Sequence, residues 1–271
     1  MGDLGGDDLR TVLAKRMPIL DSLRDAPKTK PTLTAELDHS RSTIDRAIEE
    51  LLAVECIEPT ATAGRKFRLT IVGSAALETA EAYHRDTDLL GTNVDLFTAI
   101  PPDDSIGHAF LAGADVYASD RTPDVAHQPG RNLVEAGTRM VGTAPVVRQE
   151  YFEVLLARLS DGDFELELVV ESELRAAMEQ THAEEFATLA GTDGVTVYET
   201  ETSLPYALWV VDGDDDTAGV TIQEGGATLG TIVNDTARAV AWARAAFEQC
   251  RADAQRLDVC GDRWRPEQQD S

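Results

Sequence analysis

The chain has 271 residues, enough for one large or two modest domains, and 42% of them are hydrophobic, which excludes a disordered protein. No apolar run approaches the ~18 residues that a membrane helix needs, and the first residues lack the pattern of a secretory signal. Three scattered cysteines exclude a disulfide framework and a four-thiolate zinc site. We therefore expect a cytoplasmic protein without a membrane contact.

The charge balance points to a cell interior rich in salt. The net charge is −25, from 49 acidic and 24 basic residues, and only Lys15, Lys28, Lys30 and Lys66 are lysines. Dense carboxylates hold hydrated cations, and their mutual repulsion is screened over ~3 Å at molar salt. An ordinary acidic protein explains the carboxylates but not the scarcity of lysine, so we favour salt adaptation.

The negative charge is unevenly distributed. Residues 1–85 carry 12 basic and 14 acidic groups, which leaves 24 − 12 = 12 basic and 49 − 14 = 35 acidic groups for residues 86–271. Between residues 10 and 70 the basic groups outnumber the acidic ones, 11 against 9, and all four lysines lie there. This segment is where a polyanion is expected to dock.

Short amphipathic helices are predicted in the first fifty residues. Apolar spacing predicts helical segments over 8–15 and 18–23, the latter opened by Pro18, and prolines then interrupt the helix between 26 and 31. A short helix over 32–38, capped by Thr32 or Thr34, precedes a longer one capped by Ser40. Its expected buried stripe is Ile44, Ala47, Ile48 and Leu51.

This arrangement is typical of a helix-turn-helix, whose second helix enters the major groove. An ordinary amphipathic helix is the competing interpretation. Two short strands over 55–59 and 67–70 flank a basic tip and predict a wing that holds the phosphate backbone. The predicted DNA contacts are Lys28, Lys30, Ser40, Arg41, Ser42, Thr43, Arg46, Arg65, Lys66 and Arg68.

The recognition-helix motif Ser40–Leu51 and the segment Gly64–Thr70 resemble those of archaeal winged helix-turn-helix regulators of the ArsR/MarR-like class. Asp45 departs from this motif because it places a carboxylate on the DNA-facing side of the helix. It either accepts a hydrogen bond from cytosine or forms an ion pair with Arg41 or Arg46. The next helix, expected over 72–84, would serve as a linker or dimer contact.

The remaining chain mixes predicted strands with helices, which favours an α/β domain. The last three strands are close enough in sequence to form an antiparallel meander, with Gly225 and Gly226 in one hairpin turn. Strands are expected over 94–100, 114–118, 164–170, 195–199, 207–211, 219–222 and 228–233, and helices over 132–140, 146–160, 171–190 (broken near 180) and 235–257.

Three stretches here resemble the C-terminal domain of a family of archaeal regulators described from a methanogenesis regulator, which is related in layout to TrmB-type regulators. They are 139–147, 204–212 and 230–243, within a resemblance that spans about 95–257. The resemblance implies an effector-sensing or dimerising domain and names no ligand.

The sequence offers no catalytic, metal or cofactor constellation. TrmB-type domains resemble the phospholipase D fold, whose catalysis needs a His-x-Lys pair, but no lysine follows position 66. The acidic run 212–216 lacks the sixth-position glycine and twelfth-position glutamate of a calcium loop, where Thr217 and Gln223 stand. We therefore expect a protein that is not an enzyme and has no cofactor.

A ligand pocket is predicted around Arg139, an isolated cation that we expect at a strand end, where α/β sheets bind ligands. Tyr151, Tyr206 and Trp209 are candidates for the same pocket, although core packing is the competing interpretation for each aromatic ring.

The sequence thus predicts a mixed α+β or α/β chain. It comprises a winged helix-turn-helix with a linker helix over 1–85, an acidic α/β effector or dimerisation domain over 86–260, and a flexible tail over 261–271. The expected protein is a homodimeric transcriptional regulator of a halophilic archaeon, which binds double-stranded DNA and is controlled by a small-molecule effector or a partner. The alternatives are a sensor whose winged helix contacts a protein instead of DNA, and a hydrolase that uses an unrecognised pair of carboxylates.

Overall fold

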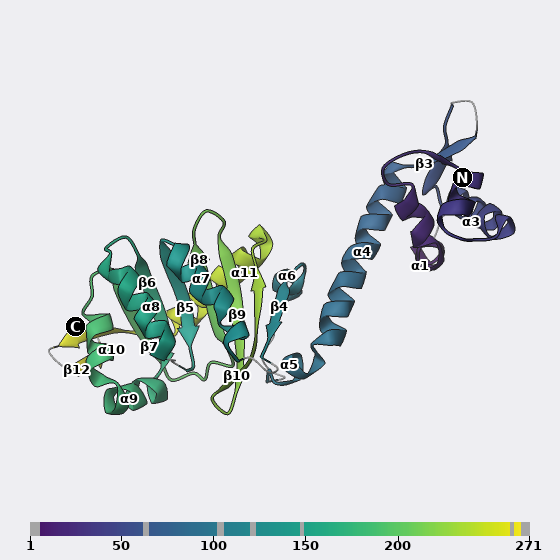
Figure 1. The fold of residues 1–271 in the computed structure, drawn as a ribbon. Coiled ribbons are helices and arrows are strands. Elements are labelled where there is room, and N and C mark those ends of the chain that lie inside the picture. Colours follow the sequence, from purple (N-terminus) through teal and green to yellow (C-terminus); the bar gives the residue numbers. More distant parts are fainter. Residues whose placement is uncertain are drawn as a thin grey trace. The chain divides into compact units, whose positions relative to one another are not determined.

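The computed structural model describes residues 6–61, 65–101, 106–119, 123–146, 149–260 and 263–266. The chain divides into two compact units, residues 1–87 and 88–271. Figure 1 colours the first unit from purple to blue and the second from blue through teal and green to yellow.

The first unit is a helical domain with a small antiparallel sheet in the order β1-β3-β2. Its core contains apolar side chains from α1, α2 and α3, including the fully buried Leu20, Leu33 and Leu51, together with side chains from both later strands and the following helix. The elements are α1 (Gly6–Ser22), β1 (Lys28–Thr29), α2 (Lys30–Glu36), α3 (Arg41–Ala53), β2 (Ile57–Pro59), β3 (Lys66–Leu69) and the greater part of α4 (Ile71–Thr92), which crosses the boundary between the two units.

Two prolines of the first unit, Pro18 and Pro31, lie elsewhere in the helices than the sequence predicted. Pro18 lies inside α1, so one continuous helix replaces the two predicted segments. Pro31 is in the first turn of α2, where a missing N–H costs nothing, and Thr29 caps that helix by accepting from the N–H of Thr32 at 3.3 Å. The predicted cap at Thr32 or Thr34 was therefore wrong.

The second unit contains a mixed sheet in the order β12-β11-β7-β6-β5-β8-β9-β10-β4. The strands β5, β6 and β7 are parallel, and β8, β9 and β10 form the predicted antiparallel meander. The strands are β4 (Asp115–Ala118), β5 (Arg139–Ala144), β6 (Glu165–Glu171), β7 (Val195–Thr200), β8 (Ala207–Asp212), β9 (Thr217–Glu224), β10 (Ala227–Asn234), β11 (Gln255–Cys260) and β12 (Arg263–Pro266).

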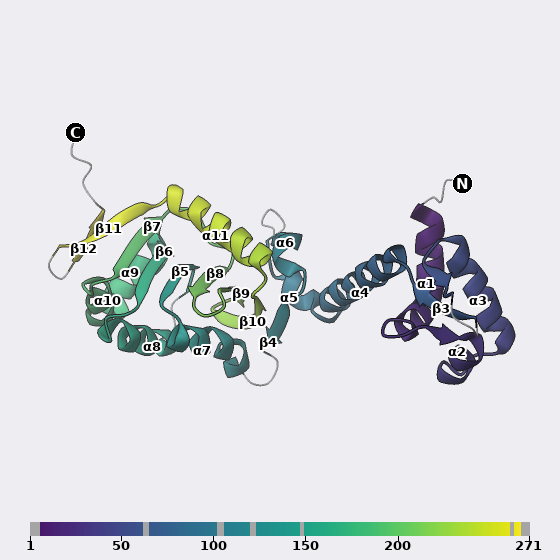
Figure 2. The same cartoon turned by 90° about the horizontal axis from the view of Figure 1, so that it is seen from above.

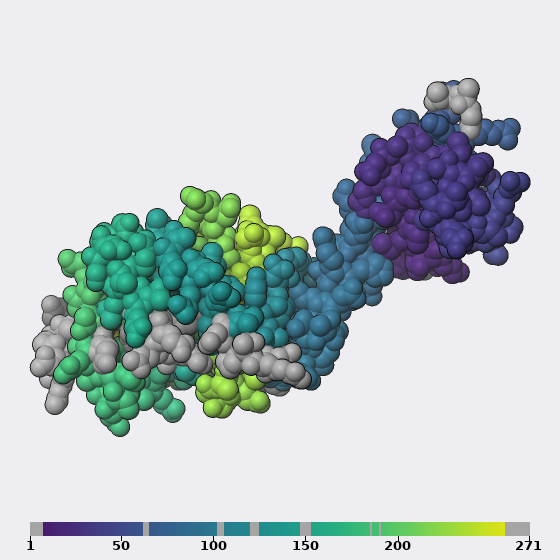
Figure 3. Space-filling view, viewed as in Figure 1, coloured from purple at the N-terminus to yellow at the C-terminus, as the bar shows by residue number. Residues whose placement is uncertain are grey.

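Helices cover both faces of this sheet. One apolar cluster lies between the sheet and α7, α8 and α10, and another lies between the sheet and α11, α5 and α6, as Figure 2 shows. In the space-filling view the teal side chains of α7 and α8 cover one face of the unit (Figure 3). The helical elements are α5 (Val94–Thr98), α6 (His108–Leu111), the 3-10 turn η1 (Pro123–Ala126), α7 (Gln128–Ala136), α8 (Gln149–Ser160), α9 (Ser172–Thr181), α10 (Ala183–Ala190) and α11 (Ala237–Ala252).

Three predicted elements of this unit were wrong in type or extent. The strand expected over 94–100 is the helix α5, which buries Leu96 and leaves Val94 exposed. The helix expected over 132–140 ends before Gly137, where a Cβ would overlap the side chain of Val211, and the chain then enters β5. The helix expected to reach residue 257 ends at Ala252.

The segment after α11 returns to the sheet. β11 pairs with β7, and β12 pairs with β11, where the sequence predicted first the end of a helix and then a flexible tail. Strand pairing with distant residues decides these elements, and local periodicity does not record it.

Candidate functional site

The first turn of α3 presents polar side chains to solvent. Ser40 caps the helix, as predicted, by accepting from the backbone N–H of Thr43 at 3.1 Å. The predicted stripe of Ile44, Ala47, Ile48 and Leu51 is buried, so the opposite face is free. Arg41, Ser42 and Arg46 are exposed on this helix, and Thr43 is half-buried.

The two arginines of α3 differ in their partners. Among the described residues, Arg41 has no carboxylate within ion-pair distance, whereas the Nε atom of Arg46 donates to Glu50 at 3.0 Å. Glu50 also accepts from Arg16 at 2.8 Å, and this bond, followed by that from Arg46, lowers the pKa of the Glu50 carboxyl. The Arg46 side chain is nevertheless 78% exposed, so a polyanion could reach it.

The two lysines that precede and open α2 are ion-paired within the first unit. Lys30 Nζ lies 2.6 Å from Asp45 Oδ1, and Lys28 Nζ lies 2.5 Å from Glu36 Oε2. The bond from Lys28 is the main cause of the lowered pKa of Glu36. Asp45 therefore pairs with Lys30, and the predicted partners Arg41 and Arg46 were wrong.

The strands β2 and β3 carry further cations. Lys66 and Arg68 are exposed and flank the buried Phe67, and Arg68 forms an ion pair with Glu58 at 2.6 Å across the two strands. Arg65 adopts the left-handed conformation (φ 48°) directly before β3 and is exposed. The predicted tip residue Gly64 lies outside the described residues.

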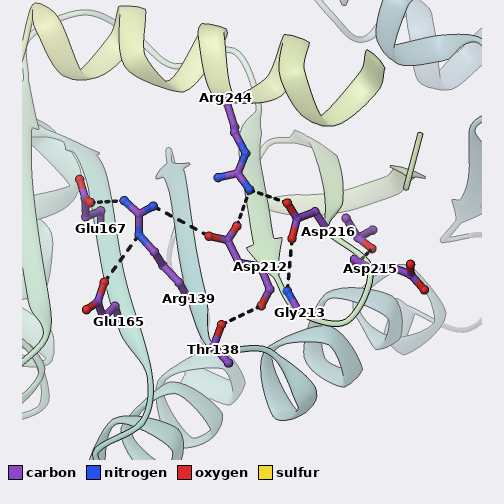
Figure 4. Close-up of polar contacts among 10 residues, drawn as sticks. Thr138, Arg139, Glu165, Glu167, Asp212, Gly213, Asp215, Asp216 and Arg244 are labelled. Carbon is purple, nitrogen blue, oxygen red and sulfur yellow. Dashed lines mark hydrogen bonds and ion pairs between the residues drawn. The ribbon is translucent and has the colours of Figure 1, made fainter. Parts of the chain in front are cut away.

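In the second unit, Arg139 takes part in a network of ion pairs (Figure 4). Its Nη2 atom lies 2.5 Å from Glu167, and it approaches Glu165 and Asp212 at 3.8 and 3.9 Å. Asp212 in turn accepts from Arg244 of α11 at 2.6 Å. Arg139 is the first residue of β5, so it lies at a strand end as predicted, but at the amino end, whereas ligands of open α/β sheets bind at the carboxyl ends.

The other predicted pocket residues are not brought to Arg139. Trp209 belongs to the cluster below α7, α8 and α10, whereas Arg139 is linked through Asp212 to α11 on the other face. Tyr206 precedes β8 at the end of the sheet opposite Arg139. Tyr151 lies in α8, but its side chain is outside the described part of the structure.

Sequence reasoning missed two features of the second unit. Arg244 binds both Asp212 and Asp216, the latter at 2.9 Å, although it lies 28 residues beyond Asp216 in the chain. Gln223 lines an apolar cavity and carries a buried side-chain oxygen. No sequence motif marks either residue, because Arg244 meets its partners through the packing of α11 on the sheet and Gln223 acquires its surroundings through strand pairing.

Two protein families have domains that match parts of the chain. Residues 123–253 match the middle domain of the methanogenesis regulatory protein FilR1. This match confirms the predicted resemblance to a methanogenesis regulator for that segment. Residues 7–89 match the HVO_A0261 N-terminal domain. No curated protein matches the sequence.

Solved structures show only loose likenesses. The archaeal chromatin protein TrmBL2, whose structure is described as showing a novel mode of DNA binding, shares 9% identity at a TM-score of 0.40, over 92% of this chain and 100% of that one. Nuc, a phospholipase D family member from Salmonella typhimurium, shares 11% identity at a TM-score of 0.40, over 53% of this chain and 97% of that one. NucT from Helicobacter pylori shares 7% identity at a TM-score of 0.42, over 52% of this chain and 96% of that one.

Two further properties concern the described residues. None of their helices is both long and apolar enough to cross a membrane. Their histidine, cysteine and carboxylate side chains form no group of three or more that is arranged to hold a metal ion.

Proposed function

We propose that the chain is a sequence-specific DNA-binding transcriptional regulator, with α2 and α3 as a helix-turn-helix and β2 and β3 as its wing. The observation that carries this proposal is the exposed first turn of α3, where Arg41 and Ser42 face solvent while the opposite stripe is buried. Arginine and serine at the start of a recognition helix can bind base edges in the major groove.

The remaining cations of the first unit would position the duplex. Arg65 and Lys66 lack a carboxylate partner among the described residues, so they are free to bind phosphates. Lys28 and Lys30 would contribute less than the sequence suggested, because each must first leave its carboxylate.

The second unit would regulate the first. The family match of residues 123–253 to a domain of a methanogenesis regulatory protein supports this role. We further propose a homodimer, because a two-fold protein suits palindromic operators, and a cytoplasmic, non-catalytic protein from a halophilic archaeon. The low lysine content and the net charge of −25 support the salt adaptation.

The pairing of cations also bears on how DNA affinity depends on salt. Each cation that neutralises a phosphate adds about −0.9 to the slope of log K against log salt concentration. Arg41, Arg65 and Lys66 lack ion pairs among the described residues, whereas the other cations of the interface would exchange one carboxylate for a phosphate. We therefore expect a slope of roughly −3 instead of the steeper slope that all the interface cations would give.

The experiment is to select bound fragments from the genomic DNA of the source organism in 2 M KCl and to measure the selected site by fluorescence anisotropy. Arg41→Ala is the preferred variant because Arg41 forms no ion pair with a described residue, and we expect it to weaken binding by about 10- to 100-fold. Arg85→Ala is the matched control: it removes an exposed arginine from α4 and should change the affinity less than about twofold.

The outcomes separate the proposed function from its alternatives. If no fragment is enriched, or if Arg41→Ala and Arg85→Ala bind equally, DNA recognition by α3 is wrong and the winged helix would instead contact a protein. A loss of more than about 1,000-fold in affinity between 0.5 and 2 M KCl would contradict the shallow salt dependence.

A further inference from the structure

A cavity of about 100 Å³ lies between the sheet and the helices α8 and α10 of the second unit. Strands β5 to β9 and the two helices supply most of its walls, His127 and Val146 complete them, and most of the lining is apolar. The apolar lining includes Leu155, Leu168, Val170, Phe186, Leu189 and Val197.

Trp209 forms one wall of the cavity, and its neighbours hold the indole ring in place. Gly219 lies on the neighbouring strand, where any Cβ would overlap the indole ring, so the ring can lie flat across β9 only because this residue is glycine. The indole N–H donates to Thr221 at 3.3 Å, and Thr221 shares a second hydrogen bond with Thr231 at 3.0 Å. Trp209 is 5% exposed, so this wall is preformed.

The lining includes a buried side-chain acceptor that the described protein groups leave unused. The side-chain oxygen of Gln223 is buried and has no hydrogen-bond partner. Thr143 also lines the cavity, but its hydroxyl accepts from the N–H of Leu208 at 2.9 Å and lies 3.3 Å from the carbonyl of Tyr206. A buried acceptor without a partner is rare in proteins and calls for a donor that occupies the site.

The position of the cavity in the sheet also suits a ligand. It is lined by Ala144, the last residue of β5, and by Val170 near the end of β6. The chain continues from β5 to β6 on one side, while β8 lies on its other side. Ligands of open α/β sheets bind at the carboxyl ends of the strands where the strand order reverses in this way.

The size and polarity of the cavity restrict the ligand. Binding sites for drug-sized molecules measure about 300–1,000 Å³, and an apolar cavity of about 150 Å³ holds benzene. A cavity of about 100 Å³ is too small for a nucleotide or a sugar, and its apolar walls would leave sugar hydroxyls without partners.

We propose that this cavity binds a small, largely apolar molecule of about five to seven non-hydrogen atoms that donates one hydrogen bond to Gln223, such as a phenol or a short-chain alcohol. Its use as the effector site of a transcriptional regulator rests on the proposed function, whereas binding itself does not.

The test uses phenol and toluene, which have the same shape and differ in the hydroxyl donor. Binding to the full chain in 2 M KCl is measured by saturation-transfer NMR and by titration of the melting temperature. We expect phenol to bind the wild type more tightly than toluene. Gln223→Met keeps the length of the side chain and removes the acceptor, so it should weaken phenol binding about tenfold and leave toluene binding within twofold.

A second variant tests the place of binding. Ala144→Leu fills the cavity from the end of β5 and should abolish binding of both molecules, with an unchanged circular dichroism spectrum. Ala227→Leu makes the same chemical change at an exposed position of β10 and should bind as the wild type does.

Three results would overturn the proposal. The first is the absence of phenol binding at millimolar concentration. The second is equal phenol affinity in wild type and Gln223→Met, and the third is binding that survives in Ala144→Leu. Because these measurements contain no DNA, their failure is separable from failure of the proposed DNA binding.

Discussion

At the residue scale, Ser40 combines a structural role with a place at the proposed DNA interface. Its hydroxyl accepts from the N–H of Thr43 and lies 2.7 Å from the hydroxyl of Thr43 and 2.9 Å from that of Ser42. The hydroxyl is therefore engaged before any nucleic acid binds. Removal of this hydroxyl should therefore first change the stability of α3.

Ser40→Ala should lower the free energy of unfolding by about 1 kcal/mol, because an N–H in the first turn loses its acceptor. Equilibrium unfolding in urea, followed by the helical circular dichroism signal in 2 M KCl, measures this change. Ser42→Ala serves as the control: it removes a neighbouring exposed hydroxyl that is not the cap, and a change within about 0.5 kcal/mol is expected. A Ser40→Ala variant as stable as the control would show that the cap contributes nothing.

Ion pairing is the residue-scale property that the sequence predicted least well. Asp45 was expected to pair with an arginine of its own helix, but Lys30, which lies 15 residues earlier, reaches it instead. The partners of Arg139 are Glu165, Glu167 and Asp212, which lie 26, 28 and 73 residues after it in the chain. Helical spacing identifies neighbours only within one element.

At the element scale, Pro18 lies inside a helix although proline disfavours helix interiors. It lies exposed in the last part of α1, while Ile19 and Leu20 directly after it are buried in the core. A proline here removes one backbone hydrogen bond and crowds the preceding turn. Burial of the following residues holds the helix together across this defect.

Pro18→Ala should therefore stabilise the first unit by about 2 kcal/mol, since it restores the hydrogen bond to the preceding turn and opens no cavity. Thermal unfolding with the helical signal as readout would register a higher melting temperature. Pro27→Ala changes an exposed proline between α1 and β1 and should give no gain, because it only loosens the unfolded chain. No rise for Pro18→Ala would mean that the helix has already adapted to the proline.

Other elements show where local patterns suffice to predict the structure and where they do not. The stripe that predicted α3 needed only its own residues, and all four stripe residues are buried. The segment 94–100 is a short apolar run, which periodicity assigns equally well to a strand or a helix, and the structure contains α5 there. β11 has charged and apolar residues mixed, and its pairing with β7 decides its conformation.

At the scale of the whole molecule, the distribution of charge sets the expected response to salt. Residues 86–271 carry a net charge of 12 − 35 = −23, against 12 − 14 = −2 for residues 1–85. Mutual repulsion of carboxylates destabilises a compact domain, and salt shortens the range of this repulsion from ~10 Å at 0.1 M to ~3 Å at 1 M.

The melting temperature of the second unit should therefore rise steeply between 0.1 and 2 M KCl, and that of the first unit should rise much less. Near-ultraviolet circular dichroism follows the second unit, which contains all three tryptophans, while the helical signal follows both units. The first unit is thus an internal control. Equal shifts of both transitions would point to a general effect of KCl on folding, and no shift would contradict salt adaptation.

The sequence by itself determined the features that depend on neighbouring residues: the helices α2 and α3 with their buried stripe, the Ser40 cap, the meander of β8 to β10 and the uneven charge. The tertiary structure alone decided the order of the sheet strands, the partners of Arg139, Asp45 and Lys30, and the cavity beside Gln223. The physical reason is the range of the interactions. Periodicity and capping act within about one helical turn, whereas strand pairing, ion pairs between elements and cavities depend on residues that only the complete fold brings together.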